Sequence, residues 1–146
     1  MRREALSATA AAHRWSAADA ARLNLVDWCR DELVPHALAE ESTLYAEAAK
    51  RPDARLLVEA MLAEHDVITG LVEEIAVTTD VTAAAELARA LEIVFRSHLA
   101  KENEQLLPLL VVAPDVSVTD LLGGMHQLIG GHHENSHSSE RKLLAT

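Results

Sequence analysis

A histidine is followed four residues later by a glutamate at two places in the chain. Glu40 follows His36 and Glu102 follows His98, while His65 stands between the two pairs. Residues three or four apart share one face of a helix, so each pair would present an imidazole and a carboxylate together. Mixed nitrogen and oxygen ligands suit iron, and zinc or manganese is the alternative. The spacing therefore predicts a metal site whose five ligands come from three helices.

Each of these five residues lies on a helical stripe that is otherwise largely apolar. The stripes run through Leu25, Cys29, Leu33, His36, Glu40 and Leu44, through Leu57, Met61, His65, Ile68, Val72 and Ile75, and through Leu87, Leu91, Val94, His98, Glu102, Gln105 and Leu109. Burying an imidazole or a carboxylate without a partner costs several kcal/mol. A bound cation would supply that partner for the whole set, although a single buried histidine is more commonly satisfied by a hydrogen bond.

The three histidines are also expected at one height in an antiparallel bundle. His36 lies about 14 residues before the helix end near Lys50, and His65 about 12 residues after the next helix begins near Asp53. A helix rises about 1.5 Å per residue, so the two heights agree within ~3 Å. The same count places His98 within about one turn, ~5 Å, of His65. Chance placement would rarely give this agreement, which favours a shared site.

The composition favours an all-α fold. Hydrophobic residues make up 49% of the chain and are mostly Ala, Leu and Val, whereas Gly, Pro and aromatic residues are few. Pro35 should kink or restart its helix, Pro52 should end it, and Asp80 or Thr82 should cap a later one. Ser16 with Asp19 resembles a capping box that starts a helix. We expect helices over residues 4–13, 17–49, 54–77, 83–110 and 119–129.

Short connections between these helices imply antiparallel neighbours. The predicted fold class is an all-α, up-down antiparallel four-helix bundle with a short first helix and a small C-terminal fifth helix. We expect the bundle over residues 1–113, the fifth helix packed on it over 114–131, and a polar, flexible tail over 132–146. His133 and His137 in that tail are four residues apart, but their Gly/Ser/Asn-rich surroundings disfavour a metal site there.

Three short motifs resemble those of the hemerythrin/HHE cation-binding family. The sequence HALAEE at residues 36–41, followed by Leu44-Tyr45, resembles the second-helix motif of that family. Glu64-His65 resembles its third-helix motif. HLAKENE at residues 98–104, followed by Leu107-Pro108, resembles its fourth. The resemblance extends from about Ala17 to Leu110 and therefore covers most of the chain.

The resemblance implies an up-down bundle around a non-heme di-iron centre. It implies reversible dioxygen binding, or sensing of oxygen, nitric oxide or iron. In the family the imidazoles are terminal ligands and the two carboxylates bridge the irons. Carried over residue by residue, the terminal ligands are His36, His65 and His98, and the bridging carboxylates are Glu40 and Glu102.

Two positions depart from the oxygen carriers of that family. Thr69 stands where they have a second histidine one turn after His65, and no histidine is available near the start of the first helix. The site could hold a single metal, or a di-iron centre completed by water or by the carboxylates of Glu41 and Glu64. His126 on the fifth helix could instead cover the open side, and the natural protein could also begin upstream of this chain.

Charge, cysteine content and hydropathy argue against nucleic-acid binding, an intrachain disulfide and a membrane span. The formal net charge of −10 would repel nucleic acid, and a single cysteine excludes an intrachain disulfide, which fits the cytoplasm. The sequence contains no apolar run of about 18 residues, so we expect no membrane-spanning helix. The resemblance to the hemerythrin/HHE family leads us to expect a metal- and gas-binding protein more than an enzyme, with dioxygen or nitric oxide as its small ligand. A di-iron oxidase or peroxidase and a metal-free helical interaction module stay as alternatives, and the oligomeric state is left open.

Overall fold

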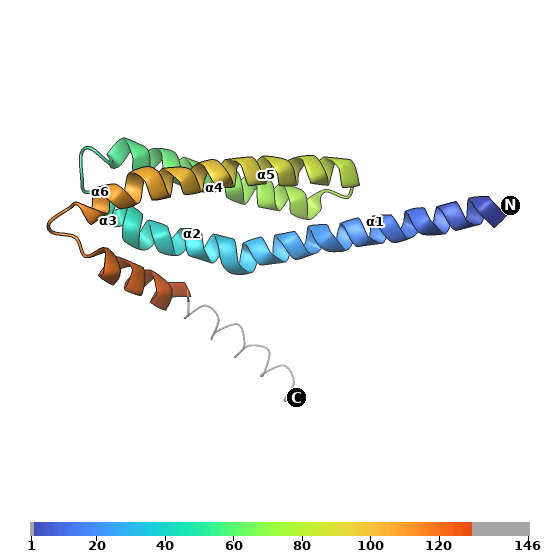
Figure 1. Ribbon diagram of the computed structural model, residues 1–146, viewed down its shortest axis with the longest axis horizontal. Coiled ribbons are helices and arrows are strands. Elements are labelled where there is room, and N and C mark those ends of the chain that lie inside the picture. The colour runs from blue at the N-terminus through green and yellow to red at the C-terminus, as the bar shows by residue number, and fades with distance from the viewer. Residues whose placement is uncertain (1, 130–146) are drawn as a thin grey trace, which may run out of the picture.

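The structure, a computed structural model, describes residues 2–129, and these are almost entirely helical (Figure 1). No strand occurs among them, and the predicted all-α helical bundle is confirmed. The tail predicted over residues 132–146, with His133 and His137, lies outside the described residues. Within residues 2–129, no helix has both the length and the hydrophobicity that crossing a bilayer requires.

One continuous helical run forms the first third of the chain. It comprises α1 (Arg2–Trp28), η1 (Cys29–Leu33), α2 (Val34–Glu40), η2 (Glu41–Tyr45) and α3 (Ala46–Ala48), where η denotes a π-helical turn. The helix break predicted at Ser16 was therefore wrong. Alanine-rich sequence lies on both sides of Ser16, so helix propensity favours continuation. Asp19 accepts hydrogen bonds from the Arg22 side chain instead of contributing to a helix cap.

The long helices accommodate two prolines through π-helical turns. η1 ends two residues before Pro35, and η3 (Glu102–Leu106) ends two residues before Pro108. A proline cannot donate from its nitrogen, and its ring clashes with the carbonyl four residues earlier. In both helices that carbonyl lies inside the π-helical turn, where bonds reach back five residues, as from the Val34 N–H to the Cys29 carbonyl. The interruption expected at Pro35 thus takes the form of a widened turn, and such turns are frequent at functional sites.

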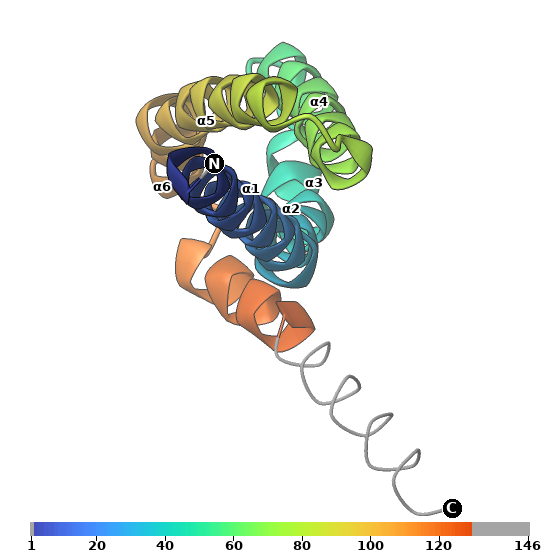
Figure 2. The same ribbon diagram turned by 90° about the vertical axis from the view of Figure 1, so that its right-hand side faces the viewer.

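Two further runs pack against the first. α4 (Arg55–Val77) returns alongside it after a turn around Pro52. α5 (Val81–Lys101) then continues through η3 into α6 (Leu107–Val111). Asp80 caps α5, because its Oδ1 accepts a hydrogen bond from the Ala83 N–H at 2.7 Å. These boundaries agree with the predicted helices, and seen along their axes the three runs form a triangle (Figure 2).

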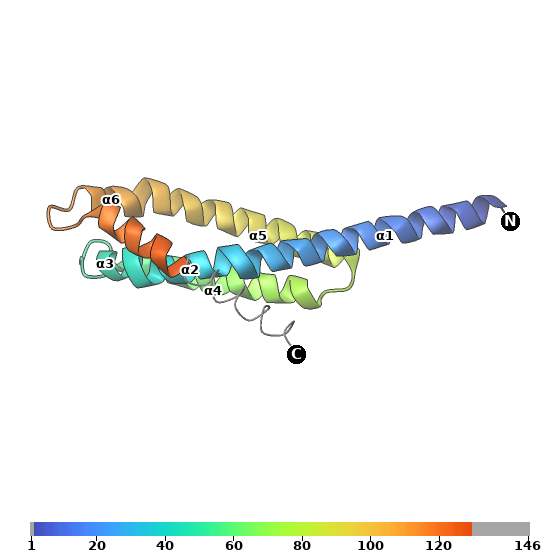
Figure 3. The ribbon, with the colours of Figure 1, turned by 90° about the horizontal axis from the view of Figure 1, so that it is seen from below.

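A last described helix spans residues 118–129 and lies beside α2 and α3 (Figures 2 and 3). Met125 on this helix is buried in a core cluster that also contains Tyr45 and Leu110. A Cβ added at Gly124 would come within 3.9 Å of Thr43, so the two helices approach closely there. The helix therefore closes the side of the bundle next to η2.

Two apolar clusters fill the interior. The first lies toward α3 and α6 and contains Ala39, Leu44, Tyr45, Ala48, Ala54, Val58, Met61, Leu106, Leu110 and Met125. The second lies toward the other end and contains Val26, Cys29, Ile68, Val72, Ile75 and Leu91. His36, His65, His98 and Glu102 fall between residues of the two clusters along their runs, and Glu40 lies among those of the first, so the polar layer has apolar packing on both sides.

Candidate metal centre

Three buried side chains from three helices converge between the two apolar clusters. Ligand atoms of Glu40, His65 and His98 all lie within 4.8 Å of one another. The Nε2 atoms of the two histidines are 3.1 Å apart, and Glu40 Oε2 lies 3.7 Å from His65 Nε2. Ligand atoms that bind one metal at about 2.0–2.2 Å are themselves about 3–3.5 Å apart. Of the two distances above, the one between the imidazole nitrogens falls in this range, and the three residues form a candidate site for a single cation.

The hydrogen bonds of the two imidazoles fix which of their nitrogens can bind a cation. Nδ1 of His65 lies 2.7 Å from Glu41 Oε1, and Nδ1 of His98 lies 3.1 Å from Glu64 Oε2. A carboxylate can only accept, so each Nδ1 donates, which leaves Nε2 of each ring as the nitrogen available to a cation. The two Nε2 atoms lie 3.1 Å apart, and the Tyr45 hydroxyl lies 3.0 Å from the one on His98. A metal ion could bind both nitrogens, and metal-binding histidines are typically anchored through Nδ1 in this way.

The two buried carboxylates of the centre also fit a cation. Glu40 and Glu102 share a hydrogen bond, and burial together with the negative charge of Glu102 raises the pKa of Glu40 to about 8. Burial likewise raises the pKa of Glu102. One carboxyl oxygen of Glu102, Oε1, is buried without a hydrogen-bond partner. A cation between the two groups would stabilise both carboxylates and satisfy the unpaired oxygen.

Glu64 links the centre to the positively charged side chain of Lys101. It accepts hydrogen bonds from Lys101 and from the ring of His98. Although burial acts in the opposite direction, these two bonds lower the pKa of Glu64 below its usual value. Glu64 is therefore a charged group that orients His98, and Glu41 takes the corresponding place beside His65. Both acidic residues contact ring nitrogens from outside the converging set.

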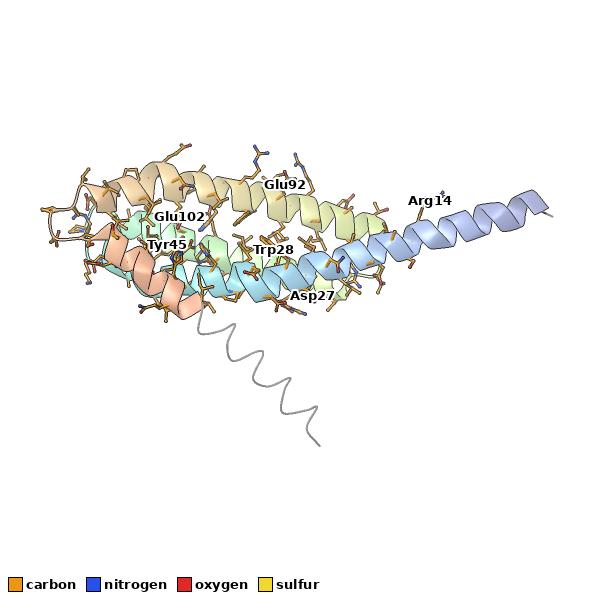
Figure 4. The ribbon with its side chains drawn as sticks, turned by 60° about the horizontal axis from the view of Figure 1, so that its bottom comes forward. Arg14, Asp27, Trp28, Tyr45, Glu92 and Glu102 are labelled. Carbon is orange, nitrogen blue, oxygen red and sulfur yellow. The ribbon has the colours of Figure 1, made fainter. Side chains whose placement is uncertain are left out.

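Tyr45 is a site residue that the sequence stripes did not include. Its ring is fully buried, stacks on His65 at a centroid distance of 5.3 Å, and its hydroxyl lies 3.0 Å from His98 Nε2. Figure 4 shows Tyr45 and Glu102 in the same interior region. Tyr45 lies five residues after Glu40, which is the wrong face in an α-helix. The π-helical turn η2 brings it round to the site, so its only sequence signal was its position at the end of the HHE-like motif.

His36 lies at the edge of the centre. Its Nε2 is 2.7 Å from Glu40 Oε1, and the side chain is 46% exposed. Partial burial and a nearby positive charge on His126 lower the pKa of His36. His126 itself is exposed and is not among the residues whose ligand atoms converge. Part of the site is thus accessible from the side of the bundle that carries His36.

All five predicted ligands line one pocket. Its walls also include Thr69, at the position where the sequence lacks a second α4 histidine, and apolar side chains such as Phe95 and Leu99. The remaining lining residues are His36, Glu40, His65, His98, Glu102, Leu33, Val34, Ala37 and Ile68. The metal-binding groups therefore face a small space whose other walls are mostly hydrocarbon.

The comparison with known families agrees with this geometry. The model of the hemerythrin HHE cation-binding domain matches residues 1–110. The chain belongs to the hemerythrin HHE cation-binding family. Membership in this family implies that the chain binds a metal cation, and the cluster of Glu40, His65 and His98 is a suitable site for it. Comparison with individual characterised proteins and with solved structures finds no match.

Proposed function

We propose that this HHE domain binds iron and, through it, a small diatomic ligand, either dioxygen or nitric oxide. The observation that carries the proposal is the pair of anchored imidazoles whose Nε2 atoms lie 3.1 Å apart beside the buried Glu40 carboxylate. Two nitrogens and an oxygen form a donor set that suits iron. A redox-inert zinc site of this composition would leave the family's gas chemistry unused.

Five residues would hold the metal. Glu40, His65 and His98 would bind the first ion, while His36 and Glu102 would complete its coordination or share a second ion with Glu40. Iron with an open coordination position would supply the affinity for a diatomic ligand. The protein's own groups hold the rings in place, since Glu41 fixes His65 and Glu64 fixes His98.

The pocket supports a small and weakly polar ligand. Phe95, Leu99 and Ile68 form walls that offer no hydrogen bond from their side chains. Tyr45 contributes a neutral hydroxyl 3.0 Å from His98 Nε2, one of the converging ligand atoms. A diatomic molecule would fit this setting better than a charged substrate, because a charged group would lose its hydration without a compensating partner.

Metal content and visible absorption test the proposal. Protein purified without air and reconstituted with ferrous iron should retain between about one and two irons per chain, the range set by one or two ions at five ligands. Exposure to air, and separately addition of nitric oxide, should each change the visible spectrum. The double variant His65→Asn, His98→Asn should retain less than a tenth of that iron.

Asp66→Asn is a matched control because Asp66 is exposed and adjacent to His65 on α4. It should keep the wild-type iron content and spectrum. Wild-type protein that takes up no iron would contradict the proposal and favour a metal-free interaction module. Iron bound equally by the double variant would place the metal elsewhere. Iron bound at the site without any spectral response to either gas would contradict the ligand part alone.

A further inference from the structure

The interior stripe of α1 continues beyond the end of the bundle. Trp15, Arg22, Val26 and Cys29 are spaced by seven, four and three residues, which places them on one face. Val26 and Cys29 are buried in the second cluster, and Arg22 donates to the carbonyls of the last turn of α4. Trp15, on the same stripe, is 57% exposed. The helix thus carries the stripe to a large apolar residue that the described residues leave more than half exposed.

The N-terminal part of α1 lies outside the triangle of helices. Figure 1 shows α1 projecting past the adjacent ends of α4 and α5, and Figure 4 places Arg14 on that projection. Residues 14–17 are all exposed. Isolated helices of about 12–15 residues are marginal in water because nucleation is costly and tertiary packing supplies most of their stability. A projecting helix of this length therefore calls for a packing partner.

An open groove begins where the projection ends. Two adjacent cavities, of about 260 Å³ and about 130 Å³, lie between α1 and α5 and share Leu25 and Ala88 in their walls. Their other walls are largely small or apolar, including Ala18, Ala21, Ala84, Ala85, Leu91 and Phe95. Small side chains permit two helix backbones to approach closely. The groove is therefore shaped to accept an alanine-rich helix.

The charges along α1 are arranged for antiparallel self-association. Residues 2–14 carry three arginines against one glutamate, a net charge of +2, in a chain of net charge −10. Residues 15–33 carry two arginines against four acidic residues, a net charge of −2. Two copies of α1 aligned head to tail would set the basic segment of each beside the acidic segment of the other. A parallel pair would set like charges together.

We propose that the projecting part of α1 packs antiparallel against the same part of a second copy of this chain. With the two-fold axis near Trp15 and Ser16, residues 2–13 of one copy lie along residues 18–29 of the other, over the open groove. Trp15 then meets its counterpart at the axis. The interface is isologous, so each copy covers the other's groove and the assembly closes as a dimer.

The full chain should sediment and scatter light as a dimer at micromolar concentration. Trp15→Asp places two carboxylates at the axis and should weaken association at least tenfold, which gives a monomer at the same concentration. Leu56→Asp is the matched control, because Leu56 is 77% exposed on α4 and lies away from α1's projection. That variant should remain dimeric. A monomeric wild type, or a dimer insensitive to Trp15→Asp, would overturn the proposal.

Distances between spin labels test the direction of pairing. In a Cys29→Ala background, labels at Ser16→Cys should lie close together across the axis. Labels at Ser7→Cys should be separated by about 25 Å along the helices, because about 17 residues at 1.5 Å each lie between them. Short distances at both positions would mean parallel helices and would overturn the proposal even if the protein is dimeric.

Discussion

The two ends of the bundle are built from the same helical runs but are closed differently. Toward α3 and α6, the fully buried Tyr45, Leu106 and Leu110 pack with Met125 from the helix over residues 118–129. Toward the N-terminal half of α1, a smaller cluster around Ile75 borders an open groove. The candidate metal centre lies between the two. It thus has the well-covered cluster on one side and the smaller cluster, which borders the groove, on the other.

Of the changes considered, metal removal should have the largest effect on the stability of the bundle. A cation bound only to the folded state stabilises it by about 4 kcal/mol at a thousandfold excess over Kd, so chelation should lower the melting temperature markedly. The double variant Glu40→Gln, Glu102→Gln should lose sensitivity to the chelator and, without metal, should melt above the wild type. The exposed pair Glu74→Gln, Glu86→Gln should behave as wild type. Equal chelator sensitivity in both double variants would mean that the stabilising metal does not bind at Glu40 and Glu102.

Cavities in the two clusters should differ in cost. Leu110→Ala in the covered cluster should lower the free energy of unfolding by about 3–4 kcal/mol, because the packed surroundings cannot collapse into the space. Leu91→Ala, whose side chain already borders the groove, should cost about 2 kcal/mol. Urea denaturation of the metal-free protein measures both values. Equal losses would mean that the groove end is packed as tightly as the other.

The pH dependence of the metal-free protein should reflect Glu40. Its pKa rises on folding to about 8, so the folded state binds the proton of this carboxyl group more tightly than the unfolded state does. The folded state therefore loses stability as pH rises from the unfolded pKa of about 4.3 through 8, by about 2 kcal/mol once relaxation is allowed for. Glu40→Gln should flatten this slope in thermal melts. Metal affinity should change in the opposite direction, rising with pH, since binding displaces the proton.

The smallest of these effects should come from the carboxylates that orient the rings. Glu41→Gln and Glu64→Gln should each weaken metal binding about tenfold, ~1.4 kcal/mol, because the imidazole loses a charged anchor but keeps its position. Competition with a chromophoric chelator gives the affinities. Glu59→Gln, an exposed change on α4, should leave them unaltered. A loss of several hundredfold in either variant would instead make that carboxylate a direct ligand.

Helical periodicity predicted the regular parts of the molecule well. The stripe of α4 from Met61 to Ile75 is buried as expected, and Asp80 caps α5. The π-helical turns could not be foreseen, because they change which residues share a face. After Glu102 the predicted stripe passed through Gln105, which is exposed, whereas Leu106 is buried. The same effect at η2 brings Tyr45 into the centre.

The path of the N-terminal segment also could not be predicted from local sequence patterns. Ser16 and Asp19 have the spacing of a helix start, but a cap forms only where the chain must turn. The alanine-rich sequence on both sides of Ser16 instead continues as one helix, α1. Which partner covers α1 is a question of tertiary and quaternary packing, and periodicity within one segment carries no information about it.

Anomalous diffraction at the iron edge, from crystals of the reconstituted full-length chain, tests the central claim most directly. The account predicts an iron peak within about 2.0–2.2 Å of Nε2 of both His65 and His98 and of a Glu40 carboxyl oxygen. A second peak beside His36 and Glu102 would indicate a di-iron centre. A peak elsewhere in the chain, with the three converging residues bound to no metal, would contradict the account.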